Sequence, residues 1–287
     1  MRITNRSLSN KIIPIILLCL FAVGCSISKN KTFTISPGND PNFVITKNTD
    51  PEFSAFNRKT KVFGLNVFAV PEVKDSVLLH VSNVLAQYID NNEDGSPDNQ
   101  LVMDSLLSSK ASMVIWFEEK DLRQLHPPEN TICQDVGNDE TNPPFVQNGM
   151  KGDFDASLEE VLHLITHAGY SKVYPDVFGE KHGSLFALAM DQARGGYFST
   201  IPKIYPKSAW YSYEDKTCTY DCQVAEYQYW VISSVLGAQK NRSNEIGHEW
   251  SLQTKELVIQ VDTLAYKIVS DTSYHLPQKL PDGSYRH

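Results

Sequence analysis

The sequence has little cysteine and lacks the short motifs that mark several common enzyme classes. Five cysteines among 287 residues are too few for a fold held by a framework of disulfides. There is no G-x-S-x-G, no P-loop and no G-x-G-x-x-G, so serine hydrolase, nucleotide-binding and dinucleotide-binding functions have no support. Basic residues are also in the minority, 26 against 34 acidic ones. This balance argues against a nucleic-acid partner and suits the binding of cations.

The first 24 residues have the pattern of an export signal. Three basic side chains precede an apolar run from 12 to 23, which is too short to span a bilayer. The run ends in AVGC at 22–25, which resembles the lipobox of bacterial lipoproteins, where the peptide is cut before a cysteine that is then lipidated. The resemblance implies that Cys25 carries a lipid and anchors the protein in the bacterial cell envelope, at the outer membrane or cell surface. The alternatives are an ordinary signal peptide and a one-span anchor, and both also take the protein out of the cytoplasm.

Loss of residues 1–24 would remove three basic and no acidic side chains, which leaves 23 basic against 34 acidic residues and a formal charge of −11. Three cysteines then remain besides Cys25, and an exported chain permits one disulfide among them. Cys218 with Cys222 is one pairing, and Cys133 with either is the other.

The residue pattern predicts an α+β, helix-rich single domain with a small sheet over residues 61–287. Residues 25–60 are rich in Ser, Lys, Asn, Asp and Pro without periodicity, which predicts a flexible tether. Valine- and phenylalanine-rich runs predict strands, and apolar stripes at helical spacing predict helices. The expected strands cover 61–71 and 111–117, and the expected helices cover 73–89, 101–107, 184–194, 222–236, 241–250 and 256–270. Residues 121–152 are expected to form a long loop, which is typical of a functional segment.

An acidic segment after the first expected helix matches the first nine positions of an EF-hand calcium loop. The matching residues are Asp90, Asn92, Asp94, Gly95, Ser96 and Asp98. The twelfth position, normally a bidentate glutamate, is Leu101, so a neighbouring carboxylate such as Asp104 would have to complete the site. The sequence therefore leaves two alternatives: a calcium site, or an Asx-rich turn that binds nothing tightly.

The strongest metal signal is the expected helix at 157–170. His163 and His167 are four residues apart in an apolar run, and Glu159 lies one turn before His163. On an α-helix these three side chains share one face. Two imidazoles at this spacing can hold one divalent ion, with zinc the first expectation.

A sheet followed by a helix with H-x-x-x-H resembles the zincin metallopeptidases, whose signature is H-E-x-x-H. The resemblance implies a zincin-like fold, His163 and His167 as zinc ligands, and Glu226 on a later helix as the third ligand. It also implies an oxyanion donor, for which Tyr227 and Tyr229 are candidates. The sequence departs from the signature because Leu164 occupies the position of the general base.

A replacement base would have to come from Glu159 or Glu160. Ser157-x-x-Glu160 is also a capping box, which would hold the Glu160 carboxylate at the helix start, whereas Glu159 is in register with both histidines. Two functions follow. One is a zinc-dependent hydrolase that acts on peptides, and the other is a non-catalytic lipoprotein whose zinc or calcium site is structural or binds an extracellular ligand.

Overall fold

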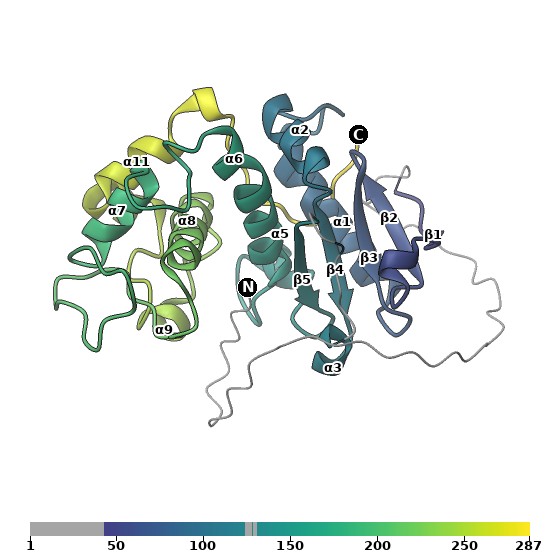
Figure 1. Ribbon diagram of the computed structural model, residues 1–287, viewed down its shortest axis with the longest axis horizontal. Helices are drawn as coiled ribbons and strands as arrows, with labels where there is room; N and C mark the ends of the chain where they lie inside the picture. Colours follow the sequence, from purple (N-terminus) through teal and green to yellow (C-terminus); the bar gives the residue numbers. More distant parts are fainter. Residues whose placement is uncertain (1–42, 124–127, 129–130) are drawn as a thin grey trace.

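A five-stranded mixed sheet with two helices packed on it forms the N-terminal half of the computed structural model (Figure 1). The structure describes residues 43–123, 128 and 131–287. The strand order is β1-β2-β3-β4-β5, antiparallel from β1 to β3 and parallel from β3 to β5. The strands are β1 Thr46–Lys47, β2 Arg58–Val62, β3 Leu65–Ala69, β4 Ser112–Trp116 and β5 Cys133–Gly137.

Helices α1 Asp75–Ile89 and α5 Ser157–Ile165 cover one face of the sheet and pack against each other. Helix α1 contacts β2 and β3, while α5 contacts β4 and the edge strand β5. Both helices are buried along almost their whole length, so they bury polar side chains together with apolar ones. The position of α5 matters for function because its opposite side faces the second half of the molecule (Figure 1).

The C-terminal half is helical and is built around α8 Tyr220–Leu236, which packs on α5, α7, α10 and α11. Helix α8 begins beside a Cys218–Cys222 disulfide and ends at Gly237, whose φ of 90° is in the left-handed region. The remaining helical elements are short. They are η1 Pro51–Phe53, α2 Gln100–Ser108, α3 Glu119–Leu122, α4 Pro144–Gln147, η2 Thr166–Tyr170, α6 Ser171–Val173, α7 Leu185–Ala193, α9 Ser243–Ile246, α10 Lys255–Val261, α11 Thr263–Val269 and η3 Thr272–Tyr274.

The C-terminal segment returns from the helical half to the sheet half (Figure 1). Tyr285 stacks on Phe43 with ring centroids 5.7 Å apart and donates a hydrogen bond to Asp90 at 2.7 Å. The two ends of the described chain therefore pack together and tie the halves into one domain. No helix in the described part of the chain combines the length and apolar character needed to cross a membrane.

The expected α+β, helix-rich single domain is confirmed, with four local corrections. The expected strand at 61–71 is a hairpin, because Phe63 and Gly64 take positive φ values and reverse the chain. The predicted loop at 121–152 contains strand β5, whose CQDVG sequence has only one large aliphatic residue and so lacks a strand pattern. The predicted helix at 241–250 is reduced to the single turn α9.

The predicted tether at 25–60 is the fourth correction. Residues 43–60 belong to the domain, because Phe43, Phe53 and Phe56 are buried in its core and β1 and most of β2 lie in this range. Burial of three aromatic side chains outweighs the polar composition around them. The remainder of the tether, the signal segment at 1–24 and the lipidation position Cys25 lie outside the described residues.

Candidate metal centre

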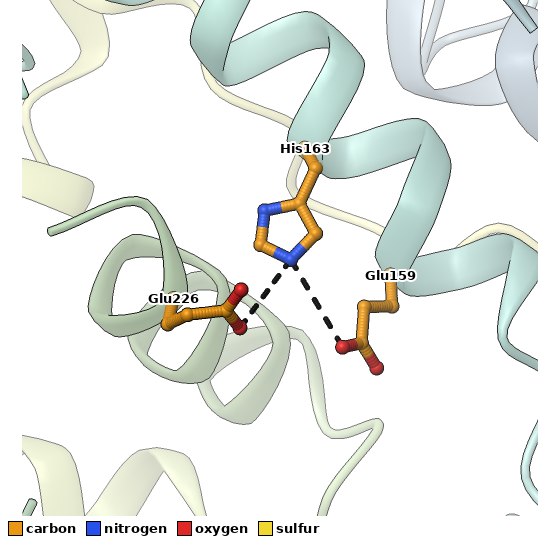
Figure 2. Close-up of side chains that lie close together, drawn as sticks. All are labelled: Glu159, His163 and Glu226. Carbon is orange, nitrogen blue, oxygen red and sulfur yellow. Dashed lines mark ion pairs between the residues drawn. The ribbon is translucent and has the colours of Figure 1, made fainter. Parts of the chain in front are cut away.

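Three buried ligand-type side chains meet where α5 packs on α8 (Figure 2). Glu159 and His163 lie one turn apart on α5, and Glu226 faces them from α8. The His163 Nε2 atom is 3.5 Å from Glu226 Oε2 and 4.0 Å from Glu159 Oε1. The exposed fractions of the side chains are 9% for Glu159, 5% for His163 and 0% for Glu226. One ligand atom from each residue lies within 4.8 Å of the others.

The atoms that face each other in this cluster have no hydrogen-bond partners. They are Glu159 Oε1, His163 Nε2, Glu226 Oε1 and Glu226 Oε2. Buried polar atoms are satisfied in nearly all folded proteins, and an unpaired one costs about 1–3 kcal/mol, more when charged. Several ligand-type atoms without a hydrogen-bond partner lie close to one another, so a cation is a candidate partner for them. The cluster therefore has the donor set of a candidate divalent-metal site.

The distances in the cluster can be compared with those around a bound zinc ion. Ligand atoms of a tetrahedral zinc at 2.0–2.1 Å are separated by about 3.3 Å from each other. The two ion-pair distances of 3.5 and 4.0 Å exceed this separation by about 0.2 and 0.7 Å. The three ligand atoms, which all lie within 4.8 Å of one another, would therefore have to move closer together to bind one ion.

Burial shifts the pKa of each of the three groups in the direction that favours its neutral form. Burial, and then the charge of Glu226, raise the pKa of Glu159 to about 7. Burial holds the pKa of Glu226 well above its usual range and lowers the pKa of His163 to about 4. A divalent cation reverses this preference for the carboxyl groups, because it stabilises their ionised forms and needs a neutral imidazole.

Glu159 is held by a second layer of polar side chains. The Tyr229 hydroxyl hydrogen-bonds to Glu159, which acts to lower the pKa of that carboxyl. The same hydroxyl accepts hydrogen bonds from Gln239 at 2.9 Å and from Arg242 at 3.4 Å, so its own proton points to Glu159. Such outer-shell contacts are typical of metal ligands. Tyr229 is thus committed to Glu159, and Tyr227 donates to Asp262, so neither hydroxyl is free to serve as the expected oxyanion donor.

His167 lies outside the cluster, although the sequence pattern pairs it with His163. Its side chain is 44% exposed, and its Nδ1 lies 2.6 Å from Glu180 Oε2. The cause is local: residues Thr166–Tyr170 form a π-helical turn, which changes the side-chain directions after Ile165. The expectation of a shared face assumed an uninterrupted α-helix. Leu164, at the expected base position, is fully buried in the apolar core.

Glu160 does not form the expected capping box. The Ser157 hydroxyl donates to Asp155 at 2.7 Å, and Asp155 also accepts the Ser157 backbone N–H, so Asp155 satisfies the start of α5. The Glu160 carboxylate instead accepts a hydrogen bond from Gln134 on β5. Burial and the nearby charge of Glu159 hold its pKa well above the usual range. Glu160 therefore lies directly after a cluster residue and is held by the edge strand.

The sequence did contain the observed grouping, in a different register. Glu159-Glu160-x-x-His163 has the spacing of H-E-x-x-H, with glutamate in place of the first histidine. The expected pair of ligands on this helix was His163 and His167, one turn later in the chain than the observed pair Glu159 and His163. Glu226 was expected as the third ligand, and it lies in the cluster.

The calcium-like loop is closed by hydrogen bonds within itself. Asp90 accepts the backbone N–H groups of Asp94 and Gly95. Asn92 accepts from Asp94 N–H, Asp94 from Ser96 N–H, and Asp98 from Asn91 N–H. Among the described residues, the cluster at Glu159 is the one group of three or more ligand-type residues close enough to hold an ion, so the loop carboxylates do not converge in the same way.

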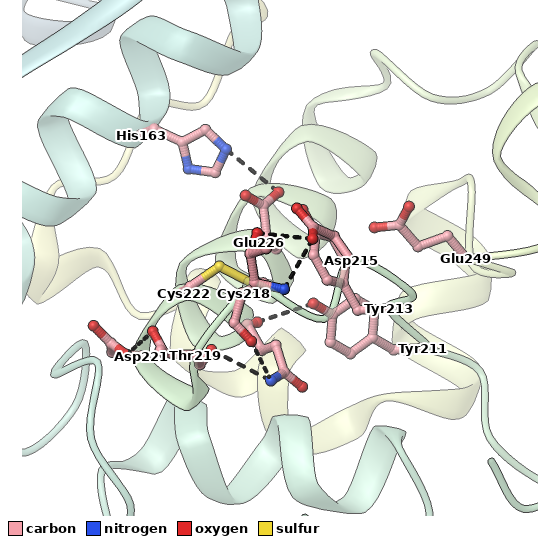
Figure 3. The surroundings of a disulfide bond; sticks show 12 residues. His163, Tyr211, Tyr213, Asp215, Cys218, Thr219, Asp221, Cys222, Glu226 and Glu249 are labelled. Carbon is pink, nitrogen blue, oxygen red and sulfur yellow. Dashed lines mark hydrogen bonds and ion pairs between the residues drawn. A yellow bond between two sulfur atoms is a disulfide. The ribbon is translucent and has the colours of Figure 1, made fainter. Parts of the chain in front are cut away.

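The Cys218–Cys222 disulfide lies at the start of α8, one turn before Glu226 (Figure 3). It is one of the three pairings that the sequence left open, and Cys133 is free. Comparison of the chain with models of known families, with curated proteins and with solved structures finds no match.

Proposed function

We propose that this chain is an exported metal-dependent peptidase. Its Glu159–His163–Glu226 cluster binds a divalent ion, for which zinc is the first candidate. The observation that carries the proposal is the set of unpaired buried atoms on all three residues. A folded protein without an ion there would bear their full desolvation cost. Natural proteins keep such a cost where function requires it.

The order of residues on α5 supports hydrolysis over simple metal binding. In the zincin signature the general base follows the first ligand directly and precedes the second ligand by three residues. Glu160 has this position between Glu159 and His163. Burial and then the charge of Glu159 raise its pKa well above that of an ordinary glutamate. The hydrogen bond from Gln134 holds the carboxylate beside the edge strand β5.

Each residue then has a role in the proposed reaction. Glu159, His163 and Glu226 hold the ion, and Tyr229 orients Glu159. A bound zinc ion supplies Lewis-acid polarisation of a carbonyl group. Glu160 accepts a proton from the attacking water and passes it to the leaving amine. One imidazole with two carboxylates also suits manganese or ferrous iron, so the metal is identified by measurement.

The metal is tested with variants on the same helix. We would purify the domain from residue 43, wild type, Glu226→Gln and Asp221→Asn, and measure bound metals by elemental mass spectrometry. Asp221 is an exposed carboxylate on the first turn of α8, so its variant matches the change of charge. We expect about one zinc per chain in wild type and in Asp221→Asn, and none in Glu226→Gln. Equal zinc in all three proteins would refute the site.

Catalysis is tested separately with Glu160→Gln, which keeps the three ligands. We expect this variant to retain zinc but to cut a peptide library at least 100-fold more slowly than wild type. Metal-loaded wild type that cuts no peptide would favour the second candidate, a non-catalytic lipoprotein that binds an extracellular ligand. One observation favours that candidate: the cluster has glutamate, Glu159, where the peptidase signature has its first histidine.

The proposal includes export and attachment to the bacterial envelope through a lipid on Cys25. Its basis is the basic segment, the apolar run and the AVGC sequence at 22–25. Expression of the full chain with radiolabelled palmitate should label the wild type and leave Cys25→Ser unlabelled. Equal labelling of the two proteins would contradict lipidation at this residue.

A further inference from the structure

We propose that the cavity between the loop at 201–205 and the segment at 212–216 binds the C-terminal end of a peptide, with its free carboxylate held by Lys203 and Lys216. This inference rests on the proposed function, because it assigns the substrate class of the same centre. The cavity has a volume of about 490 Å³, which is large enough for one or two amino-acid residues.

Two residues that line the cavity, Tyr213 and Glu249, are themselves buried and are affected by the charges of the metal cluster. Burial, and then the charge of Glu226, raise the pKa of Glu249 to about 8, and Glu159 contributes to the same shift. The pKa of Tyr213 is raised by burial and then by Glu226, Glu249 and Glu159 in turn. Figure 3 shows both residues on the side of Glu226 away from His163. The cavity therefore lies beside the Glu226 end of the cluster.

The walls of the cavity suit an apolar side chain. Ile201, Pro202 and Ile204 come from one loop, and Ile204 is 86% exposed, the largest exposure of any large hydrophobic residue in the described chain. An isoleucine with this exposure loses the benefit of burial in the free protein, and a bound apolar group would restore it. Tyr205 is fixed beside them, because its hydroxyl donates to the Tyr213 carbonyl at 3.0 Å.

The charges of the cavity select an anionic group. Lys203 and Lys216 both line it, and neither has a hydrogen-bond or ion-pair partner within the described part of the chain. Glu249 is largely protonated at neutral pH, since its pKa is raised to about 8, so Glu214 is the one remaining carboxylate of the lining. Both lysines are exposed, so their ammonium groups are accessible to a ligand in the cavity. A terminal carboxylate would pair with both through charge-assisted hydrogen bonds.

The test compares peptides that differ only in the end group. Acetyl-Ala-Ala-Phe and acetyl-Ala-Ala-Leu, each as the free acid and as the amide, are titrated into the domain by calorimetry. The proteins are wild type, the double variant Lys203→Gln/Lys216→Gln, and Lys207→Gln, a lysine of the same segment outside the cavity lining. Each is measured zinc-loaded and after treatment with a chelator.

We expect the acids to bind wild type at least tenfold more tightly than the amides, and the double variant to lose this preference while Lys207→Gln keeps it. Equal binding of acid and amide, an unchanged preference in the double variant, or no binding of any peptide would overturn the inference. Failure of the metal proposal gives a different result. Wild type would then contain no zinc, yet would still prefer acid over amide when chelated.

Discussion

The molecule carries two acidic regions that the sequence marks for metal binding, and they satisfy their oxygen atoms in opposite ways. In the Asp90–Asp98 loop, the carboxylates accept hydrogen bonds from nearby backbone N–H groups, and Asp90 also accepts one from Tyr285. In the Glu159–His163–Glu226 cluster, the buried oxygen and nitrogen atoms that face each other have no partner. The loop has the better match to a known motif, whereas the cluster has the greater physical need for an ion. Unpaired buried ligand atoms therefore point to a cation more strongly than motif similarity does.

The largest expected difference between the two regions is the effect of zinc on thermal stability. Zinc at 1,000 times its dissociation constant stabilises the folded state by about 4 kcal/mol, which in a domain of this size raises Tm by about 10 °C. We expect this shift in wild type and in Asp98→Asn, but none in His163→Ala. Differential scanning calorimetry with and without chelator measures it. A Tm shift that remains in His163→Ala and disappears in Asp98→Asn would mean that zinc binds the loop and not the cluster.

Removal of a carboxylate from each region in the metal-free protein should have opposite effects. Asp90→Ala leaves two backbone N–H groups and the Tyr285 hydroxyl unpaired, so we expect the free energy of unfolding to fall by about 3 kcal/mol. Glu226→Met replaces an unpaired buried carboxylate by an apolar chain of similar size, so we expect no loss or a gain of about 1 kcal/mol. Urea denaturation under chelator tests both variants. A large loss in Glu226→Met would mean that its carboxylate has a structural role.

The pH dependence of stability should differ between metal-free and zinc-loaded protein. The pKa of Glu159 is raised to about 7 and that of Glu249 to about 8, so protonated carboxyl groups stabilise the metal-free fold at low pH. This contribution is complete below the unfolded pKa of 4.5 and is lost as pH rises toward 8, by about 1.4 kcal/mol for each unit of raised pKa. Zinc reverses the trend, because the ion needs ionised ligands.

Melting temperatures from pH 5 to 8, with chelator or with excess zinc, check this prediction. Glu249→Gln is the control, since it removes one raised carboxyl group outside the three ligands and should flatten part of the metal-free curve. Parallel curves with and without zinc would contradict the assignment of the ion to these carboxylates.

The smallest expected effect is that of calcium on the loop. Its oxygen atoms already accept hydrogen bonds, so a calcium ion must compete with them and gains little. We expect 5 mM calcium to raise Tm by about 1–2 °C in wild type and not at all in Asp94→Ala. No shift in wild type would identify the segment as a plain Asx turn. A shift as large as that of zinc would make the loop a true calcium site.

The sequence by itself determined the fold class, most of the helices and two members of the cluster. Apolar periodicity located α1, α7 and α8, because a helix that packs on one side must repeat its apolar residues every three to four positions. The H-x-x-x-H spacing singled out His163, and the resemblance to the zincins implied Glu226. The sequence placed Glu159 one turn before His163, but it did not predict that Glu159 would be a member of the cluster.

Only the tertiary structure decided which side chains meet. The π turn at Thr166–Tyr170 sends His167 toward Glu180, and no pattern in the sequence announces a change in helical pitch. Glu160 does not cap the helix, because Asp155 already satisfies the backbone at the helix start. Gln134 donates a hydrogen bond to Glu160 from β5, a strand that the residue composition did not predict. Contacts of this kind join residues far apart in the chain, so they depend on packing rather than on local preference. The sequence thus predicted a metal site on α5, and the packing of α5 on α8 determines which side chains form the candidate cluster.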